Sequence, residues 1–139
     1  MEAESGSRMS FQCTIVTPEE QALDEAVVQA IVPAHDGLIG ILTGRSPLLA
    51  QLGVGPLRVD LANGQQRFFL VEGGVAQMKD NKLTVLTTVA KKASDLDAQT
   101  AKAEYAEAVA RRATDAKGMQ QRQKQMDRAR AAMGLAGKK

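Results

Sequence analysis

The side chains of this 139-residue sequence that could carry out chemistry are few and widely spaced. His35 and Cys13 are the one histidine and the one cysteine, and neither has neighbours in the sequence that would make it an acid–base pair or an activated nucleophile. We interpret His35 as a turn residue before Asp36 and Cys13 as a small buried residue of a strand. One histidine and one cysteine also exclude the usual zinc site and an internal disulfide. We therefore expect neither catalytic residues nor a metal site.

Basic side chains are concentrated in the last third of the chain. Residues 1–90 contain 10 acidic and 6 basic side chains, a net charge of −4, whereas residues 91–139 contain 6 acidic and 12 basic ones, a net charge of +6. The division indicates two segments with different partners, the second of which favours an acidic surface. The basic residues could meet an acidic protein, nucleic-acid phosphates or only water. Interspersed glutamines and the 3% aromatic content disfavour nucleic acid.

Short strands separated by turns are predicted for residues 10–90. Residues 57–61 alternate apolar and polar side chains, and Asn63-Gly64 follows as a hairpin turn because both residues tolerate a positive φ. Residues 66–71 return as the partner strand, and a further turn is expected at Asp80-Asn81. Since no helical period separates the strands, the pattern predicts an antiparallel β-sandwich or barrel.

Residues 91–139 are predicted to form an antiparallel hairpin of two helices, which makes the fold class mixed β plus α. Ser94 resembles the first residue of a capping box, and Lys117-Gly118 resembles a helix end. A second helix is expected to begin at about Met119. The apolar seam is predicted at Leu96, Ala103, Ala106, Ala110, Ala113, Met119, Met126 and Met133, with Ala129 and Ala132 nearby.

A set of apolar, glycine and proline residues occurs in a specific order along residues 10–134. It comprises Phe11-x-x-x-Ile15-Val16-Thr17-Pro18, then Gly37-Leu38-Ile39-Gly40-Ile41-Leu42 with Pro47-Leu48-Leu49, and finally Val71-Glu72-Gly73-Gly74-Val75 with residues 80–86. In this combination the sequence resembles the epsilon subunit of bacterial F-type ATP synthase. The resemblance implies a β-sandwich over residues 10–90 that binds gamma and the c-ring. It also implies a regulatory hairpin over residues 91–139 that restrains ATP hydrolysis.

The resemblance further implies a non-catalytic subunit of the central stalk, at the cytoplasmic face of the bacterial plasma membrane. Its expected partners are gamma, the c-ring and the catalytic beta and alpha subunits, with membrane association only through the complex and no nucleic acid. The alternative from the residues alone is a free-standing β-sandwich adaptor whose basic helical tail binds RNA or an acidic protein. Residues 1–9 are expected to be an N-terminal extension or a cloning remnant.

The resemblance also suggests which residues contact partners. Asp36, Leu38 and Arg45 are expected to face gamma and the c-ring. The basic face of the second helix would meet acidic surfaces of the catalytic subunits. The predicted inhibitory residues are Arg122, Lys124, Met126, Arg128, Arg130 and Met133.

A nucleotide-binding pattern of some family members, Ile/Leu-Asp-x-x-Arg-Ala, is incomplete here. Leu96, Asp97 and Ala101 match it, but Thr100 stands where the pattern has arginine. A threonine lacks the charge and the donor fork that an arginine offers to a phosphate or a base. We therefore expect ATP binding at this degenerate site to be weak or absent, and we expect no other cofactor.

Overall fold

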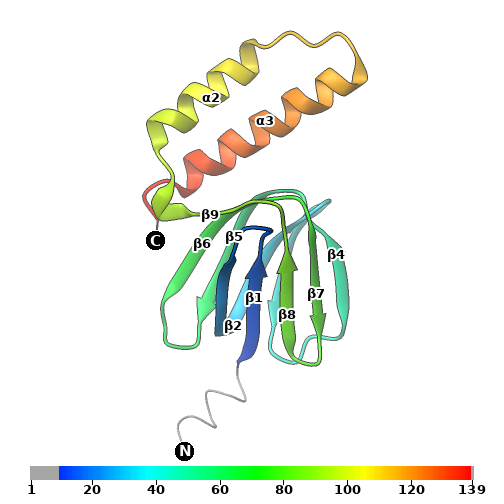
Figure 1. The fold of residues 1–139 in the computed structure, drawn as a ribbon, viewed down its shortest axis with the longest axis vertical. Coiled ribbons are helices and arrows are strands. Elements are labelled where there is room, and N and C mark those ends of the chain that lie inside the picture. Colours follow the sequence, from blue (N-terminus) through cyan, green and yellow to red (C-terminus); the bar gives the residue numbers. More distant parts are fainter. Residues whose placement is uncertain (1–9, 139) are drawn as a thin grey trace, which may run out of the picture.

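The computed structural model describes residues 10–138, so the expected extension at residues 1–9 lies outside the described residues, as does residue 139. Nine strands are followed by a short 3-10 helix and two α-helices (Figure 1). The elements are β1 (Phe11–Val16), β2 (Gln21–Ala34), β3 (Gly37–Leu42), β4 (Leu48–Gln51), β5 (Val54–Leu61), β6 (Gln66–Glu72), β7 (Val75–Lys79), β8 (Lys82–Leu86), β9 (Ala90–Lys92), η1 (Ala93–Asp95), α2 (Ala98–Ala110) and α3 (Ala116–Leu135).

The strands form one sheet that folds over into two layers (Figure 1). The strand order is β4-β7-β8-β1-β2-β5-β6-β9, and β3 also pairs with β2. The 14-residue strand β2 belongs to both layers, because its first half pairs with β1 and its second half pairs with β3 and β5. A register shift between Val27 and Gln29 lies where the two halves meet, as is typical of a strand that bends between layers. The predicted sandwich is thus confirmed.

The core lies between the two layers and follows the alternation of the strands. Cys13 and Ile15 of β1 are fully buried, as are Leu57 and Val59 of β5, while the residues between them face outward. The interpretation of Cys13 as a buried apolar residue is confirmed. Burial, and then the charge of Asp24, raises the pKa of its thiol to about 12.

Two details of the sheet differ from the expected pattern. The pair β1 and β8 is parallel, with Cys13 opposite Leu83. Alternation predicts which side chains face inward, but it does not predict the relative direction of two strands that are distant in sequence. The hairpin of β5 and β6 is present, but Asn63 does not take a positive φ. Its side chain instead accepts a hydrogen bond of 2.9 Å from the backbone N–H of Gln65.

Asp80 and Asn81 form the turn in which two non-glycine residues have a positive φ, 53° and 60°. The turn joins β7 to β8 with Lys79 opposite Lys82, the arrangement of a two-residue hairpin. The Asn81 amide group also donates a hydrogen bond of 3.0 Å to the carbonyl of Ser10, and so it ties the turn to the start of β1. The turn expected at this position is confirmed.

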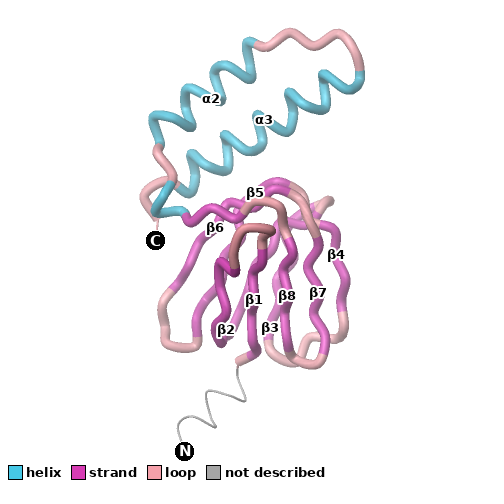
Figure 2. Tube along the Cα trace, viewed as in Figure 1, coloured by secondary structure: helices cyan, strands magenta, loops and turns pink. Residues whose placement is uncertain are grey.

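The predicted helix boundaries were wrong by several residues. Asp97 rather than Ser94 caps the first helix, and Ser94 lies in η1. The chain between the helices is residues 111–115, at the end of the hairpin farthest from the sandwich (Figure 2). Gly118 lies in the first turn of α3, where its backbone N–H donates to the capping carboxylate of Asp115 at 2.8 Å. It is therefore part of a helix start and not a helix end.

The predicted seam of α2 was also wrong. Ala101 and Ala108 are the buried residues of α2, whereas Ala103, Ala106 and Ala110 are exposed. Alanines occupy several sides of this helix, so their spacing did not define one buried face. The helical hairpin itself is confirmed.

Candidate protein-binding sites

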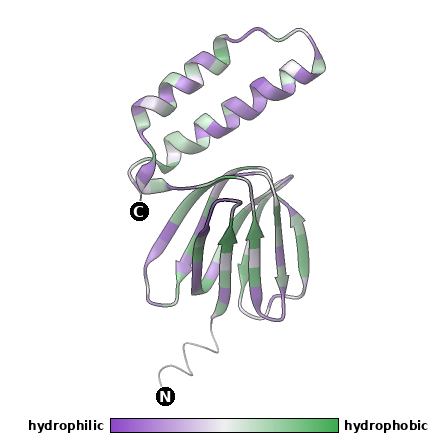
Figure 3. Ribbon diagram, viewed as in Figure 1, coloured by the Kyte–Doolittle hydropathy of each residue, from purple (hydrophilic) through white to green (hydrophobic). Residues whose placement is uncertain are grey.

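Helix α3 lies between α2 and the sandwich (Figure 1). It contacts β5 and β6 on one side and α2 on the other, and we call this arrangement the docked hairpin. Hydrophilic residues cover most of α3, whereas hydrophobic residues predominate on the strands (Figure 3). The apolar seam of the docked hairpin is small, because alanine contributes much of it. Its buried residues are Leu70, Ala93, Ala101, Ala132 and Leu135.

Arg128 of α3 contacts the elements on both sides of its helix. Its Nη2 donates to Oε2 of Glu104 on α2 at 2.7 Å, and its Nη1 lies 3.8 Å from Oε2 of Glu72 at the end of β6. The three side chains are 27% to 35% exposed, so solvent screens both ion pairs only in part. Arg128 is thus an electrostatic link between the sandwich and both helices.

The other basic residues of α3 differ in how they are used. Arg122 donates from Nη2 to the carbonyl of Val109 at 3.0 Å, near the C-terminal end of α2. Arg130 lies 5.6 Å from the ring centroid of Tyr105 and donates to its hydroxyl at 3.3 Å. Lys124 is exposed, and its ammonium group has no hydrogen bond or ion pair with residues 10–138.

The structure therefore does not bring the predicted inhibitory residues together on one free face. Three of the four basic residues hold parts of the docked hairpin in place, and only Lys124 projects freely among them. Met126 is half-buried, and Met133 packs against the apolar seam. Met119, which was expected in the seam, is 59% exposed near the loop between the helices.

The degenerate nucleotide pattern has a structural role in this chain. The carboxylate of Asp97 accepts hydrogen bonds from the Thr100 hydroxyl at 2.7 Å and from the Thr100 backbone N–H at 2.9 Å. These two bonds lower the pKa of Asp97, the hydroxyl more than the N–H. Ala101 is buried in the seam, and Leu96 packs against it. Asp97 thus caps α2, and Leu96 and Ala101 pack it against the rest of the chain.

The residues expected to contact gamma and the c-ring do not form one patch. Asp36 lies in the turn before β3, Leu38 lies in β3 and Arg45 follows it, so Asp36 and Arg45 are at opposite ends of this strand. A six-residue strand is about 20 Å long, too far for both to meet one small surface. Leu38 is 64% exposed, and its neighbour on the same face, Leu42, is 58% exposed. This outer edge of β3 is an apolar surface available to a partner.

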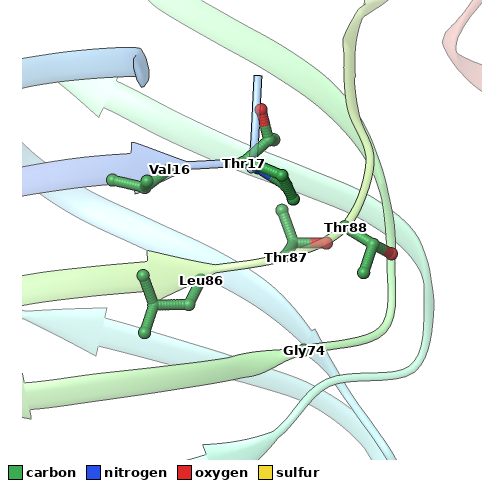
Figure 4. Close-up of a pocket in the computed structure, with 7 residues that line it drawn as sticks. Val16, Thr17, Gly74, Leu86, Thr87 and Thr88 are labelled. Carbon is green, nitrogen blue, oxygen red and sulfur yellow. The ribbon is translucent and has the colours of Figure 1, made fainter. Parts of the chain in front are cut away.

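An apolar groove of about 370 Å³ opens at the ends of β1 and β8 (Figure 4). Val16 and Leu86 are register partners in the parallel pair and lie side by side along it. Gly74, the residue before β7, also lines the groove. Its complete lining is Val16, Thr17, Pro18, Gly74, Leu86, Thr87 and Thr88.

Exposed apolar side chains continue from this groove across the outer face of its layer. Val75 pairs with Leu86 in adjacent strands, and the two are 37% and 48% exposed. Leu49 of the neighbouring strand β4 is 71% exposed. Sequence reasoning missed this surface, although the signal was present as apolar residues at outward positions of alternating strands. We call Val16, Pro18, Leu49, Val75 and Leu86 the outer apolar face.

The described residues give no support to chemistry at the single histidine. His35 lies exposed in the turn between β2 and β3, as predicted. Within residues 10–138, no group of three or more metal-ligating side chains could hold a metal ion. Over the same residues no helix has the length and apolar character needed to cross a membrane.

Comparison with known proteins gives the same family along most of the chain. Residues 10–93 match the family described as ATP synthase, Delta/Epsilon chain, beta-sandwich domain. The ATP synthase epsilon chain of Chromohalobacter salexigens is 35% identical over 127 residues, covering 91% of this chain and 85% of that relative. The epsilon chain of Rhodopirellula baltica is 42% identical over 79 residues, which cover 57% of this chain and 61% of the relative, less than two thirds of its length.

The fold has a counterpart among solved structures. A chain in the structure of the Euglena gracilis mitochondrial ATP synthase, OSCP/F1/c-ring, superimposes with a TM-score of 0.82 at 21% identity, covering 91% of this chain and 81% of that chain. At this identity the likeness concerns the fold. Together with the family match, it covers both the sandwich and the hairpin. The chain therefore belongs to the epsilon-chain family of ATP synthase, whose members are structural and regulatory, non-catalytic subunits of that peripheral membrane complex.

Proposed function

We propose that this chain is a rotor subunit that attaches to gamma and the c-ring through its sandwich and restrains ATP hydrolysis through its hairpin. Two solved structures with this fold are described as an F1/c-ring assembly and as a central stalk with c-ring, which supports a place in the stalk. The chain would act at the cytoplasmic face of the bacterial plasma membrane. It would reach the membrane only through the complex.

The observation that carries the proposal is the unequal construction of the two parts. The sandwich has a dense core and two exposed apolar surfaces, whereas the hairpin rests on a thin, alanine-rich seam. The dense core keeps the sheet rigid. Exposed apolar surface on a rigid sheet is typical of a partner site, so the sandwich suits permanent attachment. A thin seam suits a part that leaves its position and returns. We assign gamma to the outer apolar face and the c-ring to the edge of β3 with Asp36 and Leu38.

Replacing an apolar residue of the outer apolar face by aspartate is expected to weaken gamma binding. Leu86→Asp places an unpaired carboxylate in the contact and should lower the affinity for isolated gamma by about tenfold or more. Titration calorimetry with the full chain measures this. Met119→Asp is the matched control, because Met119 is similarly exposed but lies on the hairpin. Equal affinities for the two variants would contradict the assignment of gamma to this face.

The hairpin is proposed to have two positions. Docked, as described here, it permits rotation; extended along gamma, its basic helix meets acidic surfaces of the catalytic subunits and blocks rotation. The docked state uses Arg122, Arg128 and Arg130 for its own contacts. Extension that also separates α3 from α2 would free these three cations, so that they and Lys124 are unpaired on different sides of the helix and can meet acidic surfaces around it.

ATP is not expected to bind the isolated chain at concentrations up to about 1 mM. Asp97 is already engaged by Thr100, and no arginine occupies the position of Thr100. Thr100→Arg retains the backbone hydrogen bond that caps α2 and adds a donor fork, so it should produce measurable binding in titration calorimetry if the rest of the pattern is competent. Thr100→Lys, which adds charge without the fork, should gain less. A micromolar dissociation constant for the unchanged chain would contradict this prediction.

A further inference from the structure

We propose that Glu72, Arg128 and Glu104 form a latch that holds the hairpin docked and thereby sets how often it is free to inhibit. The inference rests on the proposed inhibitory function of the hairpin, which it extends by naming the contact that regulates it. The latch joins three parts of the chain, since Glu72 belongs to the sandwich, Arg128 to α3 and Glu104 to α2. Loss of its central cation would loosen both interfaces of α3.

Because the apolar seam is small, the ion pairs of the latch contribute a large share of the stability of the docked hairpin. Two leucines, Leu70 and Leu135, are the only large side chains among the buried residues of the seam in the described chain, and its other buried members are alanines. Lys138 adds a cation–π contact, with its Nζ 5.2 Å from the ring centroid of Phe68. Partly buried ion pairs matter most where the apolar contribution is small. The docked population should therefore respond to removal of the latch charges.

The acidic end of the latch is held rigidly by the sandwich. The backbone carbonyl of Glu72 accepts hydrogen bonds from the hydroxyls of Thr87 at 3.4 Å and Thr88 at 3.0 Å, and its N–H donates to the carbonyl of Val89 at 3.3 Å. The backbone that carries the Glu72 side chain is therefore held on both sides by hydrogen bonds. A fixed backbone lowers the entropy lost on forming the pair, and the remaining loss comes from the rotamers of the Glu72 and Arg128 side chains.

Arg128 has a different role in each position of the hairpin. In the docked hairpin two carboxylates surround its guanidinium, so its charge is withheld from outside partners. Undocking would expose this charge on the face proposed to inhibit. Substituting Arg128 therefore changes both the latch and the inhibitory surface. Glu72, which lies outside α3, allows the latch to be weakened while the helix keeps its sequence.

Fluorescence energy transfer within the full chain tests the latch. Donor and acceptor are attached to Gln77→Cys on β7 and Gln120→Cys on α3, both exposed positions, and the native Cys13 stays unlabelled because it is buried with a pKa of about 12. Glu72→Gln is expected to lower the ratio of docked to undocked chains by about twofold to fivefold, and Arg128→Met by about tenfold. Lys124→Gln, a neutralised cation of the same helix without an ion pair, should leave the ratio unchanged.

Equal ratios for Glu72→Gln and Lys124→Gln would overturn the latch, whatever their effect on hydrolysis. The same variants are then assembled into the complete ATP synthase, where Glu72→Gln should lower ATP hydrolysis because more hairpins are undocked. A change in the docking ratio without a change in hydrolysis would confirm the latch and contradict the inhibitory function of the hairpin. The two measurements thus separate failure of the inference from failure of the proposed function.

Discussion

ATP synthase assembled with a chain that ends at Asp95 is expected to hydrolyse ATP roughly threefold to tenfold faster than the complex with the full chain. The shortened chain keeps β9, which pairs with β6, and keeps the buried Ala93, so the sandwich loses no strand. It lacks α2 and α3 and with them every residue proposed to inhibit. The rate is measured with the assembled complex under conditions that permit hydrolysis but not synthesis.

Replacing Arg122, Lys124, Arg128 and Arg130 together by alanine should raise hydrolysis to the level of the shortened chain. Single exposed ion pairs contribute only about 0.2 to 1 kcal/mol, so Arg122→Ala alone should change the rate little. High salt should also raise hydrolysis in part, because it screens the contacts that the four substitutions remove. If the variant with all four substitutions is as inhibited as the full chain, these charges only face water. Unchanged hydrolysis with the shortened chain would mean that the hairpin is not the brake.

Gly74→Ala is expected to destabilise the sandwich by more than about 3 kcal/mol. A Cβ at this position would lie 2.0 Å from the carbonyl oxygen of Leu86 and 2.8 Å from Cα of Thr87, both backbone atoms that cannot move aside, and φ is +109°. Relief of the clash would separate β7 from the end of β8 and distort the groove. The free energy of unfolding is obtained from urea titration.

Gly73→Ala is the matched control for this change. Gly73 also has a positive φ, +76°, but a Cβ there would have no neighbour within 4 Å. Its cost should be that of the backbone conformation alone, about 1 kcal/mol. Similar losses for the two variants would show that the close approach of β7 to Leu86 does not exist as described.

The sandwich was predictable because two sequence signals agree. The alternation of apolar and polar residues indicates which side chains face inward, and the turn residues indicate where each strand ends. The strand predicted at residues 57–61 lies within β5, and the turn predicted at Asp80-Asn81 is present. The direction of β8 relative to β1 was not predictable, since alternation is the same in a parallel and an antiparallel pair. The folding over at β2 likewise depends on pairing with three different strands.

The hairpin and its site were harder to predict from sequence. Alanine marks no face of a helix, so the buried positions Ala101 and Ala108 of α2 were not predicted. Basic residues were recognised, but their carboxylate partners were not, because Glu72 and Arg128 meet only through the tertiary fold. Asp97 was assigned to a nucleotide pattern, yet its spacing to Thr100 is also that of a helix cap, and the structure shows the cap.

We propose that the sandwich attaches the chain to the stalk and that the hairpin regulates it. The most direct measurement is the affinity of isolated gamma for residues 10–95 compared with the full chain, by titration calorimetry. We expect the two dissociation constants to agree within about twofold, because the outer apolar face is complete in the shorter chain. A folded shorter chain that fails to bind gamma would contradict the account, since attachment would then require the helices.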